Sequence, residues 1–142
     1  MSKDPIILAF SGGLDTSMCV PGLKETYGRD VITATVDTGG IDAAAAKALE
    51  ERALALGAIE HVLVDSKQDF FEDVIRHLIA GNVLRGQADP LCVGAERGQQ
   101  AARLAQLAAD RKATTVAHGC TAAGNDQVRF EVALRTLNPG LD

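Results

Sequence analysis

The sequence predicts an α/β domain in which a doubly wound parallel sheet carries helices on both faces. Short, largely apolar runs that end in turn residues alternate with longer segments of helical pattern, which is typical of this class. The 142 residues suit one compact domain, residues 1–142. Hydrophobic residues make up 46% and charged residues 23% of the chain, as in globular proteins. Aromatic residues make up only 4%, so the core must be built from Ala, Val, Leu and Ile.

Four short runs are predicted to be strands of the sheet. Each is a continuous apolar segment rather than an alternating one, which indicates a strand that is buried on both faces. Each run ends at polar or glycine residues, where the chain can turn. The four runs cover residues 6–10, 31–36, 61–64 and 113–117.

Five helical segments follow these strands. Asp42 is a suitable N-cap for the Ala-rich second helix, and Gly57 is a suitable stop. Ser66 or Asp69 can cap the third helix. Strands that alternate with helices predict parallel pairing through right-handed crossovers. The predicted helices cover residues 16–27, 42–56, 66 or 69 to 79, 95–110 and 126–137.

Residues 81–94, between the third and fourth helices, have no clear periodicity. Long irregular connections in compact domains are often functional. Two interpretations stay open: a functional loop over the carboxyl edge of the sheet, and a simple link between two helices.

Composition excludes several classes of function. The net charge of −5 argues against a broad basic face for nucleic acid. No apolar run approaches the roughly 18–20 residues that cross a bilayer. Three scattered cysteines without a C-x-x-C pair indicate neither a disulfide framework nor a zinc site. No spacing suggests a metal cluster, so His61 and His77 are expected to be structural or surface residues. We expect a soluble cytoplasmic protein with no nucleic-acid or membrane partner.

The loop after the first strand, residues 11–17, has the composition of an anion-binding site. Its two glycines let the backbone turn tightly and present N–H groups, and the helix that follows adds its positive dipole end. Ser11, Thr16 and Ser17 supply hydroxyl donors. The alternative is a tight strand–helix turn with Asp15 as a cap.

A second polar segment follows the fourth predicted strand. His118 and Gly119 lie at its carboxyl end, where ligands bind in open parallel sheets, and Gly119 lets a ligand approach the backbone. Asn125 and Asp126 then open a helix, and Arg129 follows one turn later on the same face. Asp126 can receive an ammonium group and Arg129 a carboxylate. A solvated Asp–Arg ion pair is the alternative.

The two polar segments together resemble a known family. Ser-Gly-Gly-x-Asp-x-Ser after a first strand is the signature of the PP-loop ATP pyrophosphatases, and residues 9–17, AFSGGLDTS, are similar to the argininosuccinate synthase family. AHGCT at 117–121 and GNDQVRFE at 124–131 are close to that family's other hallmark. The resemblance runs from about residue 6 to the last residue, and residues 38–40 and 81–85 look like a bacterial branch.

The resemblance implies roles for individual residues. Aspartate would bind at Thr121, Asn125 and Asp126, and citrulline at Asn125 and Arg129. Asp15, Asp126 and Arg129 are the candidate catalytic residues. ATP would be held by Ala9, Phe10, Ser11, Gly12, Gly13, Leu14, Asp15, Thr16, Ser17, the backbone at Val36, and Gly119.

The implied reaction is the ATP-dependent ligation of citrulline and aspartate in arginine biosynthesis. The citrulline ureido oxygen attacks the α-phosphate, pyrophosphate leaves, and the aspartate amine then displaces AMP. Mg²⁺ is expected on the phosphates, because phosphate and carboxylate oxygens suit it. The family also implies a homo-oligomer, a tetramer in longer members.

The chain departs from the usual family pattern in several places. When the chain is aligned with the family on Arg97, two positions differ that usually contact citrulline. Asp89 replaces a Tyr and Gly94 replaces a Ser, which weakens the expected citrulline site. Ala122 and Ala123 replace a Gly-Lys pair, which removes a positive charge.

The resemblance also implies a sheet of order 3-2-1-4-5 whose fifth strand, with a second domain, would follow Asp142. Without that strand the fourth becomes an edge that favours self-association. Two alternatives to the ligase remain: a stand-alone or degenerate ATP-binding protein, and a PP-loop enzyme that adenylates another substrate.

Overall fold

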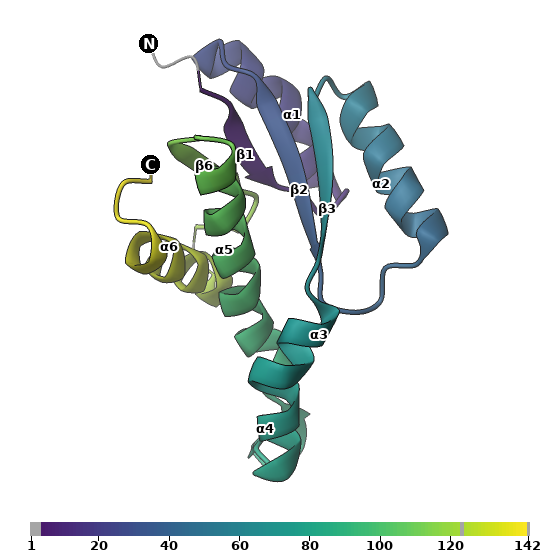
Figure 1. Cartoon of the computed structure of the whole chain (residues 1–142), viewed down its shortest axis with the longest axis vertical. Helices are drawn as coiled ribbons and strands as arrows, with labels where there is room; N and C mark the ends of the chain where they lie inside the picture. Colours follow the sequence, from purple (N-terminus) through teal and green to yellow (C-terminus); the bar gives the residue numbers. More distant parts are fainter. Residues whose placement is uncertain (1–3, 123, 142) are drawn as a thin grey trace.

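The computed structural model describes residues 4–122 and 124–141 and contains a four-stranded parallel sheet with helices on both faces (Figure 1). The strand order is β3-β2-β1-β6, and every neighbouring pair is parallel. This confirms the predicted class and the order 3-2-1-4 of the first four parallel strands. The replacement at Ala123 lies outside the described residues. The strands are β1 (Ile6–Ala9), β2 (Val31–Asp37), β3 (Glu60–Asp65) and β6 (Thr115–His118).

The helices follow the strands as predicted, with ends shifted by up to three residues. Asp42 caps the second helix by accepting a hydrogen bond from the Ala45 N–H at 2.7 Å, and Gly57 follows that helix with a φ of 99°. The third predicted helix is continuous but contains a π-helical turn. The helical segments are α1 (Leu14–Tyr27), α2 (Ala43–Ala55), α3 (Lys67–Phe70), η1 (Phe71–Ile75), α4 (Arg76–Ala80), α5 (Cys92–Asp110) and α6 (Asn125–Leu137).

Ser66 is the N-cap residue of the third helix, as predicted, but neither Ser66 nor Asp69 makes a side-chain capping hydrogen bond. The buried Ser66 hydroxyl accepts instead from Gln99 at 2.9 Å and from Arg103 at 3.2 Å, both on α5. Asp69 also pairs with Arg103. The start of α3 is therefore held by α5 and by Asp65, whose carboxylate accepts from the Lys67 N–H at 3.1 Å.

The fourth parallel strand, β6, begins two residues later than predicted. The Thr114 N–H and hydroxyl both donate to the Asp4 carboxylate, at 2.8 and 2.7 Å. Arg29 donates to the same carboxylate at 2.8 Å and to the Thr115 hydroxyl at 2.9 Å. These bonds hold the start of β6 beside that of β1, at the sheet edge opposite the loop that follows β1.

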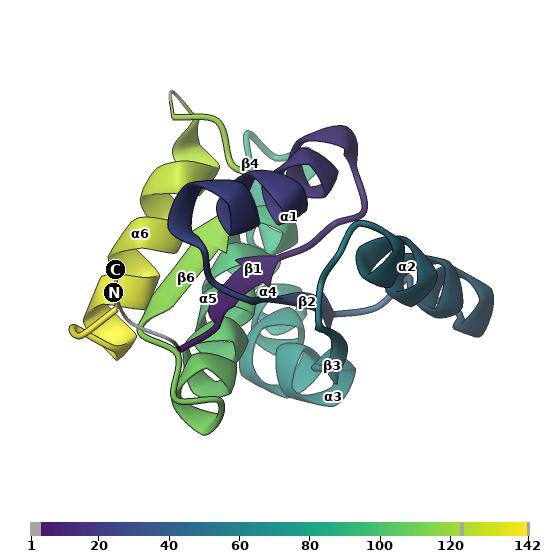
Figure 2. The ribbon, with the colours of Figure 1, turned by 90° about the horizontal axis from the view of Figure 1, so that it is seen from above.

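The sheet separates two hydrophobic clusters, because alternate residues of each strand point to opposite faces. Ile7 of β1 and Ile32 of β2 pack with α5 and α6 on one face. Leu8 packs with Val20 of α1 and Ala53 of α2 on the other face. Figure 2 shows α1 and α5 on opposite sides of the sheet. Both clusters are built mainly from Ala, Val, Leu and Ile with a few Phe, as the composition predicts.

The irregular segment 81–94 contains a short antiparallel hairpin, β4 (Leu84–Arg85) and β5 (Asp89–Pro90). It follows directly on α4, where the Val83 N–H donates to the Leu78 carbonyl at 3.0 Å. In Figure 1, α3 and α4 project below the sheet as a helical arm. Residues 81–89 are exposed, and none of the described side chains of residues 81–89 and 91–94 lines the cavity described below. The last residue of the segment, Gly94, lies against Arg129 of α6, so both interpretations of the segment stay open.

Within the described part of the chain, no helix combines the length and apolar character needed to cross a membrane.

Candidate functional site

A cavity of about 440 Å³ lies at the carboxyl edge of the sheet. Its walls come from the ends of β1, β2 and β6, from the loop after β1, and from α5. The segment after β2 contributes Thr38, Gly39 and Ile41. Single residues of three helices, Thr16 of α1, Leu49 of α2 and Phe130 of α6, complete the lining. This is where open parallel sheets bind ligands, because the strand ends and the following turns leave a crevice there.

The loop between β1 and α1 forms one wall of the cavity. Gly12 has a φ of 72°, a conformation that favours glycine, and Gly13 is the N-cap residue of α1. The Ser11 and Thr16 hydroxyls lie 3.2 Å apart, and the Thr16 hydroxyl also donates to the Gly13 carbonyl at 3.3 Å. Asp15 makes no capping hydrogen bond, so its interpretation as a cap is wrong.

The loop and the end of β6 meet, although they lie about a hundred positions apart in the sequence. The register pairs Ala9 of β1 with His118 of β6, which brings Gly119 against the first turn of α1. A Cβ built on Gly119 would lie 2.9 Å from the Thr16 methyl carbon and 3.7 Å from the Asp15 Cβ. Only a residue without a side chain fits this approach, so the two segments form one site.

The predicted ATP residues divide into two sets. About half line the cavity, and the rest lie in the loop or first helical turn without lining it. Leu14 is 80% exposed and Asp15 is also exposed. The lining set is Ala9, Phe10, Ser11, Thr16, Val36 and Gly119, and the other set is Gly12, Gly13, Leu14, Asp15 and Ser17.

Helix α2 covers the loop from the side. The Arg52 guanidinium donates to the Gly12 carbonyl. A Cβ on Gly12 would lie 2.5 Å from a terminal methyl carbon of Leu49. Both contacts link the loop to a helix that the sequence did not associate with the site.

Asp37, at the end of β2, is a cavity residue that the sequence analysis missed. Its side chain is only 2% exposed, and it accepts from Lys67 at 2.8 Å and from the Gly39 N–H at 2.9 Å. Burial raises the pKa of Asp37, but the bonds from Lys67 and Gly39 outweigh it and hold the pKa below the ordinary value. A carboxylate directly after a buried strand is the signal that would have identified it.

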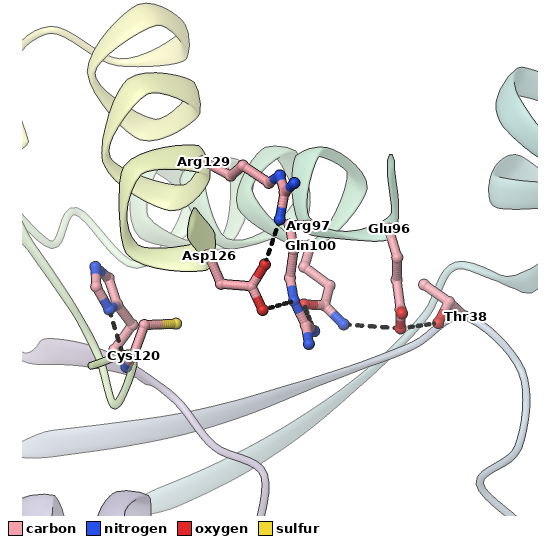
Figure 3. Close-up of polar contacts among 8 residues, drawn as sticks. Thr38, Glu96, Arg97, Gln100, Cys120, Asp126 and Arg129 are labelled. Atoms are coloured by element: carbon pink, nitrogen blue, oxygen red, sulfur yellow. Dashed lines mark hydrogen bonds and ion pairs between the residues drawn. The ribbon is translucent and has the colours of Figure 1, made fainter. Parts of the chain in front are cut away.

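Asp126 lies between two arginines (Figure 3). It accepts from Arg129 at 2.8 Å and from Arg97 of α5 at 3.1 Å. The hydrogen bond from Arg129 lowers the pKa of Asp126, and Arg97 adds to this effect. The ion pair between Asp126 and Arg129, which the sequence analysis gave as the alternative to a substrate site, is therefore present. Arg97, which the sequence analysis used only for alignment, also pairs with Asp126.

The predicted amino-acid residues Thr121, Asn125, Asp126 and Arg129 do not line the cavity. Thr121, Asn125 and Arg129 are exposed, and Asp126 is half-buried. Arg97 lines the cavity and pairs with Asp126, so it connects the two regions.

Arg97 also begins a polar chain along the cavity wall (Figure 3). It donates to the Gln100 side-chain oxygen at 2.9 Å, and Gln100 donates to Glu96 at 2.9 Å. The Thr38 hydroxyl donates to the same Glu96 oxygen at 2.6 Å. The sequence analysis missed this chain, although Gln100 lies three positions after Arg97 and four after Glu96, the spacings at which side chains of a helix meet.

His118 and Cys120 lie on the wall formed by the end of β6. The His118 ring packs on Phe130 with ring centres 5.4 Å apart, and burial lowers the pKa of His118. Burial, with the nearby Asp126, raises the pKa of the Cys120 thiol. Cys120 therefore lacks the lowered pKa of a reactive cysteine.

The described residues contain no group of three His, Cys, Asp or Glu side chains that could hold a metal ion. Mg²⁺ can be held by one or two carboxylates together with phosphate oxygens and waters. Asp15 is exposed in the first turn of α1, and a single carboxylate there fits this mode of binding.

Comparisons with known proteins identify a matching family. The Arginosuccinate synthase N-terminal HUP domain matches residues 5–142. The curated argininosuccinate synthase of Streptococcus thermophilus is 43% identical over 142 residues, which cover 99% of this chain and 34% of that protein. That of Clostridium kluyveri is 40% identical over 139 residues, which cover 98% of this chain and 34% of that protein. The chain thus spans about a third of the length of these curated relatives.

Proposed function

Because this chain belongs to the argininosuccinate synthase family, we propose that it binds ATP as the nucleotide-binding part of a ligase that joins citrulline and aspartate in arginine biosynthesis. The observation that carries this proposal is the contact between Gly119 and the first turn of α1. It joins a loop suited to phosphates to the end of β6 around one cavity.

The phosphates would lie at the loop after β1. Ser11 and Thr16 line the cavity and bring two hydroxyls together there, and the loop N–H groups and the start of α1 add positive potential. Mg²⁺ would neutralise charge on the phosphate oxygens, with Asp15 of the first turn of α1 as the protein carboxylate. The apolar side chains of Val36, Leu104 and Phe130 suit the purine ring.

The amino-acid substrates would lie beside Asp126 and Arg129. Arg129 would hold a substrate carboxylate with its planar fork, and Asp126 would receive the aspartate ammonium. Asp126 is engaged by two arginines, so substrate would have to exchange with one of those contacts. An exposed pair can exchange at little cost, because it contributes about 0–1 kcal/mol.

The reaction that we propose has two steps. The citrulline ureido oxygen attacks the α-phosphorus of ATP, pyrophosphate leaves and citrullyl-AMP forms. The aspartate amine then attacks the activated ureido carbon, loses a proton and displaces AMP. The residues of this chain would contribute positioning and charge stabilisation rather than a covalent nucleophile.

Titration calorimetry with ATP tests the proposal. We expect ATP to bind, and both Asp15→Ala and Gly12→Val to abolish binding. Asp15 is exposed, so its replacement leaves the fold intact. Gly12→Val forces a branched side chain into a left-handed conformation and against Leu49, so its thermal unfolding must be measured as well.

Asp73→Ala is the matched control, because Asp73 is an exposed carboxylate of η1 outside the cavity. Unchanged ATP affinity in both loop variants would contradict the site. Adding citrulline and aspartate and measuring AMP then separates binding from ligation. We expect binding without turnover from the 142 residues alone.

A further inference from the structure

We propose that Glu96 and Gln100 determine base specificity by reading the amino edge of the adenine ring. The inference rests on the proposed function, because it takes ATP as the occupant of the cavity. Both residues lie on α5, line the cavity and are half-buried. Neither belongs to the residues expected to hold the phosphates or the amino-acid substrates.

The Glu96 carboxylate is held in place through one of its oxygens. Its Oε1 accepts from the Thr38 hydroxyl at 2.6 Å and from the Gln100 amide at 2.9 Å. Among the described residues, its Oε2 accepts no hydrogen bond, and no Lys or Arg forms an ion pair with Glu96. Oε2 is therefore an acceptor with free capacity on the wall of a ligand-sized cavity.

Gln100 supplies a donor beside this acceptor. Its side-chain oxygen accepts from Arg97 at 2.9 Å, which fixes the amide with its nitrogen toward Glu96 (Figure 3). One N–H of that nitrogen serves Glu96, and the second has no acceptor among the described residues. An acceptor next to a donor matches adenine, whose 6-amino group donates and whose adjacent ring nitrogen accepts.

Charge sets the direction in which the nucleotide lies. Two carboxylates line the cavity in the described part of the chain, and Asp37 is neutralised by Lys67. Glu96 has no such partner, so it repels phosphates and attracts N–H donors. The nucleotide avoids the repulsion and gains the attraction when its triphosphate lies at the Ser11–Thr16 wall and its base lies at Glu96.

Inosine triphosphate gives a sharp test, because it replaces the 6-amino donor of adenine with a carbonyl acceptor and the adjacent ring acceptor with an N–H donor. With the unaltered chain we expect ATP to bind about tenfold or more tightly than inosine triphosphate, since that carbonyl would face a carboxylate. Glu96→Gln supplies an amide that can donate to the carbonyl. In that variant we expect the ratio of ATP affinity to inosine triphosphate affinity to fall by about fivefold, while the inosine N–H still meets the Gln100 donor.

Two further variants complete the measurement, each checked for folding by circular dichroism. Glu96→Ala removes the acceptor, so it should weaken ATP binding and thereby reduce the preference for ATP over inosine triphosphate. Glu25→Gln makes the same chemical change as Glu96→Gln on an exposed position of α1 outside the cavity and should leave the preference unchanged.

The outcomes separate this inference from the function on which it rests. If ATP binds but is not preferred over inosine triphosphate, or if the preference survives Glu96→Gln and Glu96→Ala, base reading by Glu96 is wrong and ATP binding stands. If the unaltered chain binds no ATP, both are wrong. A preference that collapses in the Glu96 variants and persists in Glu25→Gln supports the inference.

Discussion

Gly94 lies against the guanidinium group of Arg129. A Cβ built on Gly94 would lie 3.7 Å from the Arg129 Cζ, an ordinary van der Waals contact. The family resemblance places a citrulline-binding Ser at this position. The structure therefore has room for that side chain, and its absence removes a hydroxyl from beside Arg129.

We predict that citrulline binds weakly and that Gly94→Ser strengthens its binding about fivefold, the effect of one hydrogen bond of about 1 kcal/mol. Calorimetry with citrulline in the presence of ATP measures this. Gly98→Ser, one turn further along α5, is the control, because a Cβ at Gly98 would have no neighbouring atom within 4 Å. Tight citrulline binding by the unaltered chain would contradict the prediction.

Two half-buried histidines should make stability depend on pH. Burial lowers the pKa of His61 and of His118 below the ordinary 6.5, so the unfolded chain binds protons more readily than the folded chain. Their contribution to stability is therefore present above pH 6.5 and is lost as the pH falls below it. The carboxylates with lowered pKa values, such as Asp37, lose their contribution only near and below 3.8.

We predict a lower free energy of unfolding at pH 5.5 than at pH 7.5, as measured by urea denaturation. These two pH values lie on either side of the ordinary histidine pKa of 6.5. His61→Phe, which removes a buried ring nitrogen without a hydrogen-bond partner in the described structure, should reduce the difference. Replacing the exposed His77 by Gln should not change it. A difference that is the same in all three proteins would exclude His61 as a cause.

At the scale of elements, two glycines at helical positions should respond in opposite ways to the same substitution. Gly98 lies inside α5 with open space around it, whereas Gly28 caps α1 with a φ of 60°. Alanine favours a helix interior by about 1 kcal/mol but is strained in a left-handed conformation.

We therefore predict that Gly98→Ala raises the free energy of unfolding by about 0.5–1 kcal/mol and that Gly28→Ala lowers it by about 1 kcal/mol. Thermal or urea unfolding measures both, and each variant is the control for the other. The same sign in both variants would show that backbone conformation does not decide their effect.

For the whole molecule, the outer edge of β6 is the feature that bears on assembly. In the described sheet β6 pairs with β1 alone, and its sequence, TVAH, contains no Lys or Pro to protect an edge. Helix α6, which follows β6 in the chain, carries exposed apolar side chains that include Val128 and Val132.

We predict that the 142-residue chain self-associates through this edge. Sedimentation over a range of concentrations should show dimers or larger species, and amide exchange in β6 should slow as concentration rises. The alternative is association through the apolar face of α6. Val132→Lys tests it, because the Val132 side chain is 60% exposed, and we expect this variant to associate as the unaltered chain does. A monomer at every concentration would refute the prediction.

The sequence by itself determined the order of elements and the two polar segments. Continuous apolar runs, the Asp42 cap and the Gly57 stop depend on interactions between near neighbours in the chain, so local pattern suffices to predict them. The same holds for the loop at Ser11–Ser17, whose glycines and hydroxyls are adjacent in sequence. No local pattern in the sequence predicted the π-helical turn of η1 or the hairpin of β4 and β5.

Only the tertiary structure decided which side chains share the cavity. The β1–β6 register brings Gly119 to Thr16, the end of β3 brings Lys67 to Asp37, and α5 brings Glu96 to Thr38. These partners lie 30 to 103 positions apart, and each contact depends on strand order, register and the packing of α5 across the sheet. Such distances are set by the whole core at once, and no local pattern of residues carries them.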